Sequence, residues 1–317
     1  MKEITVISGK GGTGKTTIAA ALATAGKNMV LCDADVDAAD LHLILEPQIR
    51  ESHVFEGSWV AHIDNELCTQ CGICSEYCRF DAISLNGSGQ LVIDPFRCEG
   101  CRLCERICPS KAITSERSSR NTWYVSDTRS GIMVHARMGP GEENSGKLVS
   151  KVREKARELA TQNKAAVILT DGPPGTGCPV IASITGTDAV LVVIEPSKSS
   201  LHDAARVIEL VESFRIPVFA LINKHDIHPE TTAEIESFLE AHSIPVAGRI
   251  PFSEKVVEAM IAGQSIVEYE PGAEISGIIR QVWDRIAVPA ESDCVYTEIP
   301  YVRSVLKDAV PKLNRYL

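Results

Sequence analysis

The sequence lacks three features that would point to a membrane, to export or to a nucleic acid. It has no run of about 18 apolar residues, so no segment is expected to span a bilayer. Its start has no basic stretch followed by an apolar segment, so no signal peptide is expected. Basic residues are not in excess, because 32 Lys and Arg stand against 42 Asp and Glu, a formal charge of −10. This balance argues against nucleic acid as the main partner, since phosphate binding needs a basic face, and it leaves room for a local basic patch.

Cysteine, in contrast, is abundant, with 11 residues in a chain of 317. The missing export signal favours a cytoplasmic protein. In that reducing compartment, cysteines are metal ligands, catalytic groups or buried thiols before they are disulfides.

Short apolar runs that alternate with helical segments predict an α/β fold. The runs cover residues 4–8, 29–32, 166–170, 189–194 and 218–222, and the helical segments cover 16–25, 147–163, 200–214 and 231–242. Near-continuous apolar strands that alternate with helices indicate a mostly parallel, doubly wound sheet covered on both faces.

A change of pattern predicts three parts of the chain. Between residues 61 and 115 the apolar runs give way to cysteines, which indicates an insertion into the α/β domain. We therefore predict a discontinuous domain over 1–60 and 116–287, an inserted domain over 61–115, and a tail over 288–317.

A glycine-rich loop follows the first apolar run. Residues 9–16 match the P-loop pattern G-x-x-x-x-G-K-[ST] between a strand and a helix, the context that the motif requires. Backbone N–H groups in such a loop approach phosphates, Lys15 reaches the β- and γ-phosphates, and Thr16 binds Mg²⁺. The predicted ATP-binding residues of the loop are Gly9, Lys10, Gly11, Gly12, Thr13, Gly14, Lys15, Thr16 and Thr17.

The second lysine, Lys10, makes the loop resemble the deviant P-loop of the MinD/ParA/Mrp/nitrogenase-iron-protein superfamily of ATPases. The resemblance implies a nucleotide-dependent dimer in which Lys10 reaches the partner's phosphates. It also implies that Asp35 positions the attacking water and contributes to the Mg²⁺ site, with Asp37 as the alternative, and that Asp171 lies on the Mg²⁺ side. The residues that it implies for contact with the adenine are Asn223, Lys224, Pro251 and Phe252.

Eight cysteines form two copies of one run, C-x₂-C-x₂-C-x₃-C, thirty residues apart. This is the two-cluster bacterial ferredoxin pattern, in which the fourth cysteine of each run serves the other cluster. One 4Fe–4S cluster is then held by Cys68, Cys71, Cys74 and Cys108, and the other by Cys98, Cys101, Cys104 and Cys78. Zinc is the alternative ligand, since C-x₂-C pairs also bind zinc.

Three features remain open at this level. Cys32 ends an apolar run and fits a buried core thiol. Cys178 follows Asp171 by seven residues, which suits a redox-active or structural thiol, or a cluster bridging two subunits. Apolar and basic residues alternate over 302–317, which fits either docking onto the protein or contact with anionic lipid.

These patterns together predict an ATPase switch coupled to two 4Fe–4S clusters. The main interpretation is ATP-gated electron transfer to a redox partner, with the chain acting as a homodimer or as a heterodimer with a paralogue. The alternatives are an Mrp-type iron–sulfur carrier, a MinD-like positioning ATPase, and an amide-forming ligase.

Overall fold

The computed structural model describes residues 1–142 and 146–287. The predicted tail over 288–317, and with it Cys294, lies outside this range. Within the described residues, no helix is long and apolar enough to cross a bilayer.

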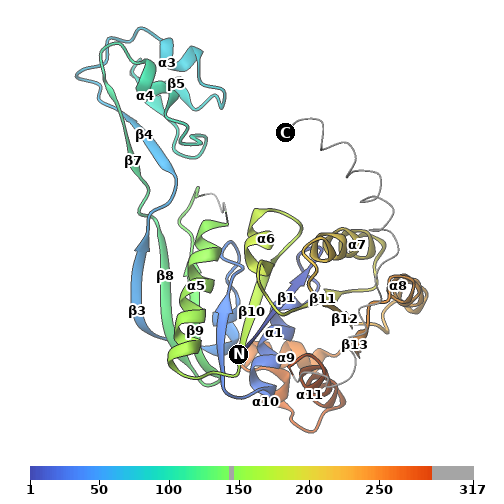
Figure 1. Ribbon diagram of the computed structural model, residues 1–317. Coiled ribbons are helices and arrows are strands. Elements are labelled where there is room, and N and C mark those ends of the chain that lie inside the picture. Colours follow the sequence, from blue (N-terminus) through green and yellow to red (C-terminus); the bar gives the residue numbers. More distant parts are fainter. Residues whose placement is uncertain (143–145, 288–317) are drawn as a thin grey trace, which may run out of the picture. The chain divides into compact units, whose positions relative to one another are not determined.

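A nine-stranded sheet forms the centre of the fold, in the order β13-β12-β11-β1-β10-β2-β9-β8-β3 (Figure 1). Pairing is parallel from β13 to β9 and antiparallel at β9–β8 and β8–β3. The strands are β1 (Lys2–Ser8), β2 (Met29–Asp33), β3 (Gln48–Phe55), β8 (Asn121–Thr128), β9 (Gly131–Arg137), β10 (Val167–Pro174), β11 (Ala189–Ile194), β12 (Val218–Asn223) and β13 (Val246–Ile250).

Helices cover both faces of this sheet because its central strands are apolar on both sides. In β11, Leu191 and Val193 belong to the core beneath α1 and α11, whereas Val190, Val192 and Ile194 belong to the core beneath α7 and α8. A third core lies under α5. The helices are α1 (Lys15–Ala25), α2 (Leu41–Leu45), α5 (Lys147–Gln162), α6 (Cys178–Ile184), α7 (Lys198–Ser213), α8 (Pro229–Ala241), α9 (Glu254–Ile261), α10 (Ile266–Tyr269) and α11 (Glu274–Ala287).

The cysteine-rich segment has its own small elements and its own core. Its elements are β4 (Trp59–Ile63), α3 (Ile73–Glu76), β5 (Ile83–Leu85), β6 (Leu91–Ile93), α4 (Leu103–Ile107) and β7 (Ile113–Arg117). β4 pairs with β7 and β5 pairs with β6, both antiparallel. We call residues 59–117 the cysteine module. The predicted domain boundaries at 60/61 and 115/116 fall inside β4 and β7 and stay a prediction.

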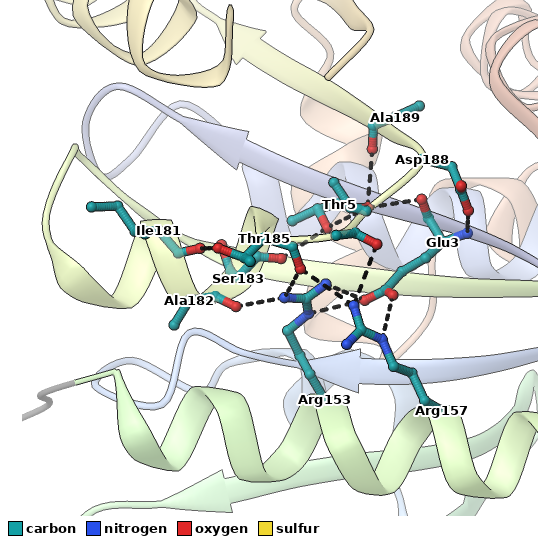
Figure 2. A network of polar contacts seen from close by, with 12 residues as sticks. Glu3, Thr5, Arg153, Arg157, Ile181, Ala182, Ser183, Thr185, Asp188 and Ala189 are labelled. Atoms are coloured by element: carbon teal, nitrogen blue, oxygen red, sulfur yellow. Dashed lines mark hydrogen bonds and ion pairs between the residues drawn. The ribbon is translucent and has the colours of Figure 1, made fainter. Parts of the chain in front are cut away.

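A buried ionic network ties β1 to α5 and α6 (Figure 2). Arg153 Nε lies 2.9 Å from Glu3 Oε1, and its Nη1 donates to the carbonyl oxygens of Ala182 and Thr185. Arg157 Nε reaches the other oxygen of Glu3 at 2.7 Å. The side chains of Glu3 and Arg153 are only 6% and 4% exposed, whereas that of Arg157 is 41% exposed. The network therefore fixes α5 against the first strand of the sheet.

We expect Arg153→Ala to lower the free energy of unfolding by about 3 kcal/mol, at the lower end of the range for broken buried ion pairs because Arg157 stays beside Glu3. Arg157→Ala should cost only about 0–1 kcal/mol, since the exposed half of the network is screened by water. Urea unfolding of the two variants compares them directly. Equal losses would contradict the inner position assigned to Arg153.

Candidate functional site

The glycine loop lies between β1 and α1, at the carboxyl edge of the parallel sheet. Gly12 and Gly14 have φ angles of +83° and +88°, a backbone region that favours glycine. A Cβ atom at Gly9 would lie 2.4 Å from the backbone of Asp203 in α7, so the loop approaches that helix closely. Glycine at these positions lets the loop turn directly into α1.

Lys15 sits among carboxylates that come from two neighbouring strands. Its Nζ lies 2.8 Å from Asp171 Oδ1 and 3.1 Å from Asp35 Oδ2. Burial opposes the charge on Lys15, but Asp171 and Asp35 more than offset it and raise its pKa above the usual range. Two carboxylates that lie 20 and 156 residues away in the sequence thus meet at one ammonium group. The predicted contact of Lys15 with phosphates stays a prediction.

Asp33 is a member of this cluster that the sequence did not single out. It is fully buried, it pairs in register with Asp171 across β2 and β10, and its Oδ1 accepts a hydrogen bond from the N–H of Asp35. Burial and the charge of Asp171 raise its pKa well above the ordinary value. Asp33 Oδ2 and Asp171 Oδ2 are buried without a hydrogen-bond partner among the described residues. Oxygens of this kind suit a hard divalent cation or its bound water.

A cleft of about 780 Å³ opens beside the loop. Its polar wall includes Lys15, Thr16 and Thr17, together with Asp35 and Asp37. Asp35 is buried, and burial raises the pKa of its carboxyl group, whereas Asp37 is exposed. Asp35 contacts Lys15 directly, at 3.1 Å. Four exposed apolar side chains also line the cleft, namely Leu43, Val257, Met260 and Ile261.

Lys10 turns away from this cleft toward the end of β11. Its Nζ forms an ion pair of 2.8 Å with Glu195 and hydrogen bonds of 3.2 Å with Ser197 and Ser199. Lys224 also reaches Glu195, at 3.5 Å. Within the chain, then, the second loop lysine has an internal carboxylate partner.

Of the residues expected at the adenine, Asn223 contacts the loop directly. Asn223 Nδ2 donates a hydrogen bond of 2.8 Å to the carbonyl of Thr13, so β12 holds the loop directly. Phe252 is about half exposed, and its N–H donates to Asp226. Pro251 follows β13 immediately. The roles of these residues and of Lys224 toward a nucleotide stay predictions.

The two cysteine runs repeat in backbone geometry as well as in sequence. The carbonyl oxygens of Asp64 and Asp94 accept hydrogen bonds of 3.0 and 3.1 Å from the N–H groups of Cys68 and Cys98. The positive φ angles recur thirty residues apart, at Gln70 and Gly100, Gly72 and Arg102, and Asp81 and Lys111. A repeated left-handed conformation in non-glycine residues is unusual. The module thus consists of two equivalent halves.

The cysteine side chains face the interior that these halves share. Six of them line the small core around Ala61, Ile83 and Ile113, namely Cys68, Cys74, Cys78, Cys98, Cys104 and Cys108, while Cys71 and Cys101 are exposed. Burial raises the pKa of Cys104 to about 11, and the nearby Cys98, Cys101 and Cys74 contribute. Across the described residues, no three His, Cys, Asp or Glu side chains converge as closely as a single metal ion requires.

The remaining cysteines differ in exposure. Cys32 is fully buried in β2, and burial raises the pKa of its thiol to about 12, as for an inert core residue. Cys178 is exposed at the first position of α6. Its carbonyl oxygen would lie 3.0 Å from a Cβ atom at Gly146, so the starts of α5 and α6 are in close contact.

Comparison with known proteins agrees with this geometry. Residues 4–266 match the CobQ/CobB/MinD/ParA nucleotide binding domain. An uncharacterized protein of Methanocaldococcus jannaschii is 30% identical over 90% of this chain and 96% of its own length, and a second protein of that organism is 25% identical over 85% and 93%. The septum site-determining protein MinD of Thermotoga maritima is 25% identical over 98% of both chains.

Solved structures have the same fold at low identity. MinD of Pyrococcus horikoshii complexed with Mg-ADP covers 90% of this chain and 95% of its own, with 17% identity and a TM-score of 0.53. The MinC:MinD cell division complex of Aquifex aeolicus covers 92% and 97%, with 20% identity and a TM-score of 0.53. The likeness confirms the predicted α/β P-loop architecture with a largely parallel sheet.

Proposed function

The chain belongs to the CobQ/CobB/MinD/ParA family of nucleotide-binding domains, and on that premise we propose that it is a dimeric ATP-hydrolysing switch that gates electron transfer by two 4Fe–4S clusters. The observation that carries the proposal is the presence in one chain of a P-loop lysine held by carboxylates and a twofold-repeated eight-cysteine module.

The nucleotide half rests on the carboxylate cluster. A triphosphate on the glycine loop would compete with Asp35 and Asp171 for Lys15, so binding would release both carboxylates. Thr16, Asp35 and Asp171 are the proposed residues on the Mg²⁺ side, and the unpartnered oxygens of Asp33 and Asp171 fit such an ion. Bound Mg²⁺ would neutralise phosphate charge. Asp35 is the proposed residue that orients the attacking water.

The cluster half rests on the repeat. Cys68, Cys71, Cys74 and Cys108 are the proposed ligands of one cluster, and Cys98, Cys101, Cys104 and Cys78 those of the other. A four-iron cube separates its thiolates more widely than a single ion does, which agrees with thiols spread around a small core. Such clusters supply one-electron storage. The protein's own contribution is to hold the thiolates, to shield six of them in part from water, and to shape the two loops.

Contacts between the module and Gly141 and Glu142, which precede α5, support coupling. Gly141 packs on the ring of Phe96, since a Cβ atom there would lie 2.6 Å from Phe96 Cδ1, and Phe96 is two residues before Cys98. Glu142 accepts hydrogen bonds from Ser118 and Asn121, which border the module. Gly146, the N-cap residue of α5, packs against Cys178.

The partners follow from the same proposal. Family resemblance implies a nucleotide-dependent dimer, in which Lys10 would exchange Glu195 for phosphates of the other subunit. Two relatives of this chain in Methanocaldococcus jannaschii support a heterodimer of paralogues as an alternative to a homodimer. A redox protein is the proposed acceptor.

The test is made on anaerobically purified full-length protein. Iron and sulfide are counted, and reduction by a low-potential one-electron donor is timed with MgATP, with MgADP and without nucleotide. We expect about eight irons per chain, and rates that differ by about fivefold or more between the two nucleotides. Zinc in place of iron, or equal rates, would refute the proposal. Loss of iron to an apo-acceptor protein on adding ATP would favour the carrier alternative instead.

A further inference from the structure

Trp59, at the start of β4, is stacked with two arginines of the cysteine module. The guanidinium carbon of Arg102 lies 4.2 Å from the centre of its ring, and that of Arg117 lies 4.5 Å from it. The backbone of Trp59 also touches Gly100, where a Cβ atom would lie 2.2 Å from the Trp59 carbonyl oxygen. This stack therefore fixes two positive charges at the loop that runs from Cys98 to Cys104.

The other half of the module has no counterpart of this stack. The residues thirty positions away from Trp59, Arg102 and Arg117 are all glycines, namely Gly89, Gly72 and Gly87. Backbone conformation is nevertheless the same, since Arg102 and Gly72 have φ angles of +60° and +77°. The two halves therefore share a loop conformation and differ in the side chains that it carries.

The two halves of the module also differ in formal charge, and the second half is again the more positive one. Residues 64–76, which contain the first loop and α3, carry three acidic and no basic side chains, a charge of −3. The equivalent residues 94–106 carry three acidic and three basic side chains, a charge of zero. Glu105 pairs with Arg102 at 2.8 Å and offsets part of its charge, but Arg106 replaces Glu76, and Arg117 adds a further cation.

We propose that the two halves of the module hold their clusters at unequal reduction potentials, with the site of Cys98, Cys101, Cys104 and Cys78 the higher. This rests on the proposed function, since it requires clusters at both sites. Reduction adds one electron, supplied by a one-electron donor, and so one negative charge, which nearby cations stabilise and nearby anions destabilise. An electron entering the chain settles at the half whose loop contacts Trp59 and, through Phe96, Gly141.

An exchange of the two loop residues tests the assignment. Arg102→Gly places glycine in a left-handed conformation that suits it. Gly72→Arg meets no atom within 4 Å of its Cβ and takes a left-handed conformation that strains an arginine, as Arg102 already does. Glu76→Gln removes one exposed negative charge from the first half without touching the backbone. Arg50→Gln, on exposed β3, is the matched control for loss of a surface charge.

Potentiometric titration of the full-length protein, followed by electron paramagnetic resonance, is expected to resolve two one-electron steps. Arg102→Gly should make the higher step less favourable by about threefold to tenfold in its equilibrium constant, and less so at high salt. Gly72→Arg and Glu76→Gln should make the lower step more favourable. Arg50→Gln should move neither.

The outcomes separate this inference from the proposed function. Two coincident steps in the unaltered protein, or an Arg102→Gly effect on the lower step, overturn the inequality while leaving eight irons and the nucleotide effect intact. Fewer than about eight irons per chain would instead count against the proposed function itself. Iron and sulfide counts of each variant show whether a shift arises from charge or from loss of a cluster.

Discussion

Replacing Lys15 with methionine is expected to abolish ATP hydrolysis and to weaken ATP binding by about tenfold to hundredfold. A charge-assisted hydrogen bond contributes about 1.5–3 kcal/mol, and 1.4 kcal/mol corresponds to a factor of ten. Lys15 also balances the negative charge of the carboxylates around it, with Asp35 at 3.1 Å and Asp171 at 2.8 Å. The variant should therefore lose stability as well as affinity.

The stability loss has a predicted pH dependence. Without the ammonium group, the pKa of Asp33, already raised by burial and by Asp171, rises further. A carboxyl whose pKa is raised in the folded state stabilises the fold below its unfolded pKa and loses that contribution as the pH rises through the folded value. The difference in free energy of unfolding between Lys15→Met and the unaltered protein should thus be largest at alkaline pH and shrink toward about pH 4. Urea unfolding across this range measures it.

Lys10→Met is the matched control, since it makes the same substitution five residues away in the same loop. Lys10 contacts Glu195, Ser197 and Ser199 and lies outside the carboxylate cluster. This variant should bind ATP within about threefold of the unaltered protein. It should lose the nucleotide-dependent dimer and hydrolysis, because the proposed function places the contact of Lys10 with phosphate across subunits. If Lys15→Met bound ATP as well as Lys10→Met does, the assignment of the P-loop would be wrong.

Local signals made most of the central fold predictable. Each of the five apolar runs is a buried strand, and each of the four helical segments is a helix within a few residues of its predicted ends. The outer strands were not predicted. In β3 most side chains are exposed, so its sequence has no apolar period, and its pairing with β8 is set by antiparallel contacts with residues more than 60 positions away.

In the candidate site, too, the features with a local sequence signal were predictable and those that depend on strand order were not. The glycine loop is a local pattern, and its lysine is where the motif places it. The neighbours of that lysine depend on the order of strands, because β2 and β10 are adjacent only in the folded sheet. Asp33 was missed for this reason, since its burial opposite Asp171 follows from register and not from the spacing of three aspartates. Glu195, the partner of Lys10, lies 185 positions away and has no local signal.

Replacing Cys104 with serine is expected to remove about half of the iron, from about eight to about four atoms per chain. Cys104 lies in the shared core beside Cys74, at the point where α3 and α4 of the two halves meet. Serine binds iron more weakly than a thiolate does, because its hydroxyl is hard and rarely ionised. Iron and sulfide counts, together with the visible absorption of the clusters, measure the loss.

The folding of the module should change along with its metal content. Its core has only a handful of buried apolar residues, Ala61, Ile83, Leu91 and Ile113 among them, so the thiolates and what they bind must contribute much of its stability. Limited proteolysis of Cys104→Ser should therefore cut within residues 59–117, while ATP binding persists because the nine-stranded sheet has separate cores. Cys178→Ser is the control, since this exposed thiol lies outside the module and its loss should leave iron and proteolysis unchanged. A Cys104→Ser protein with full iron would remove Cys104 from the ligands, and iron loss in Cys178→Ser would require a cluster near α6.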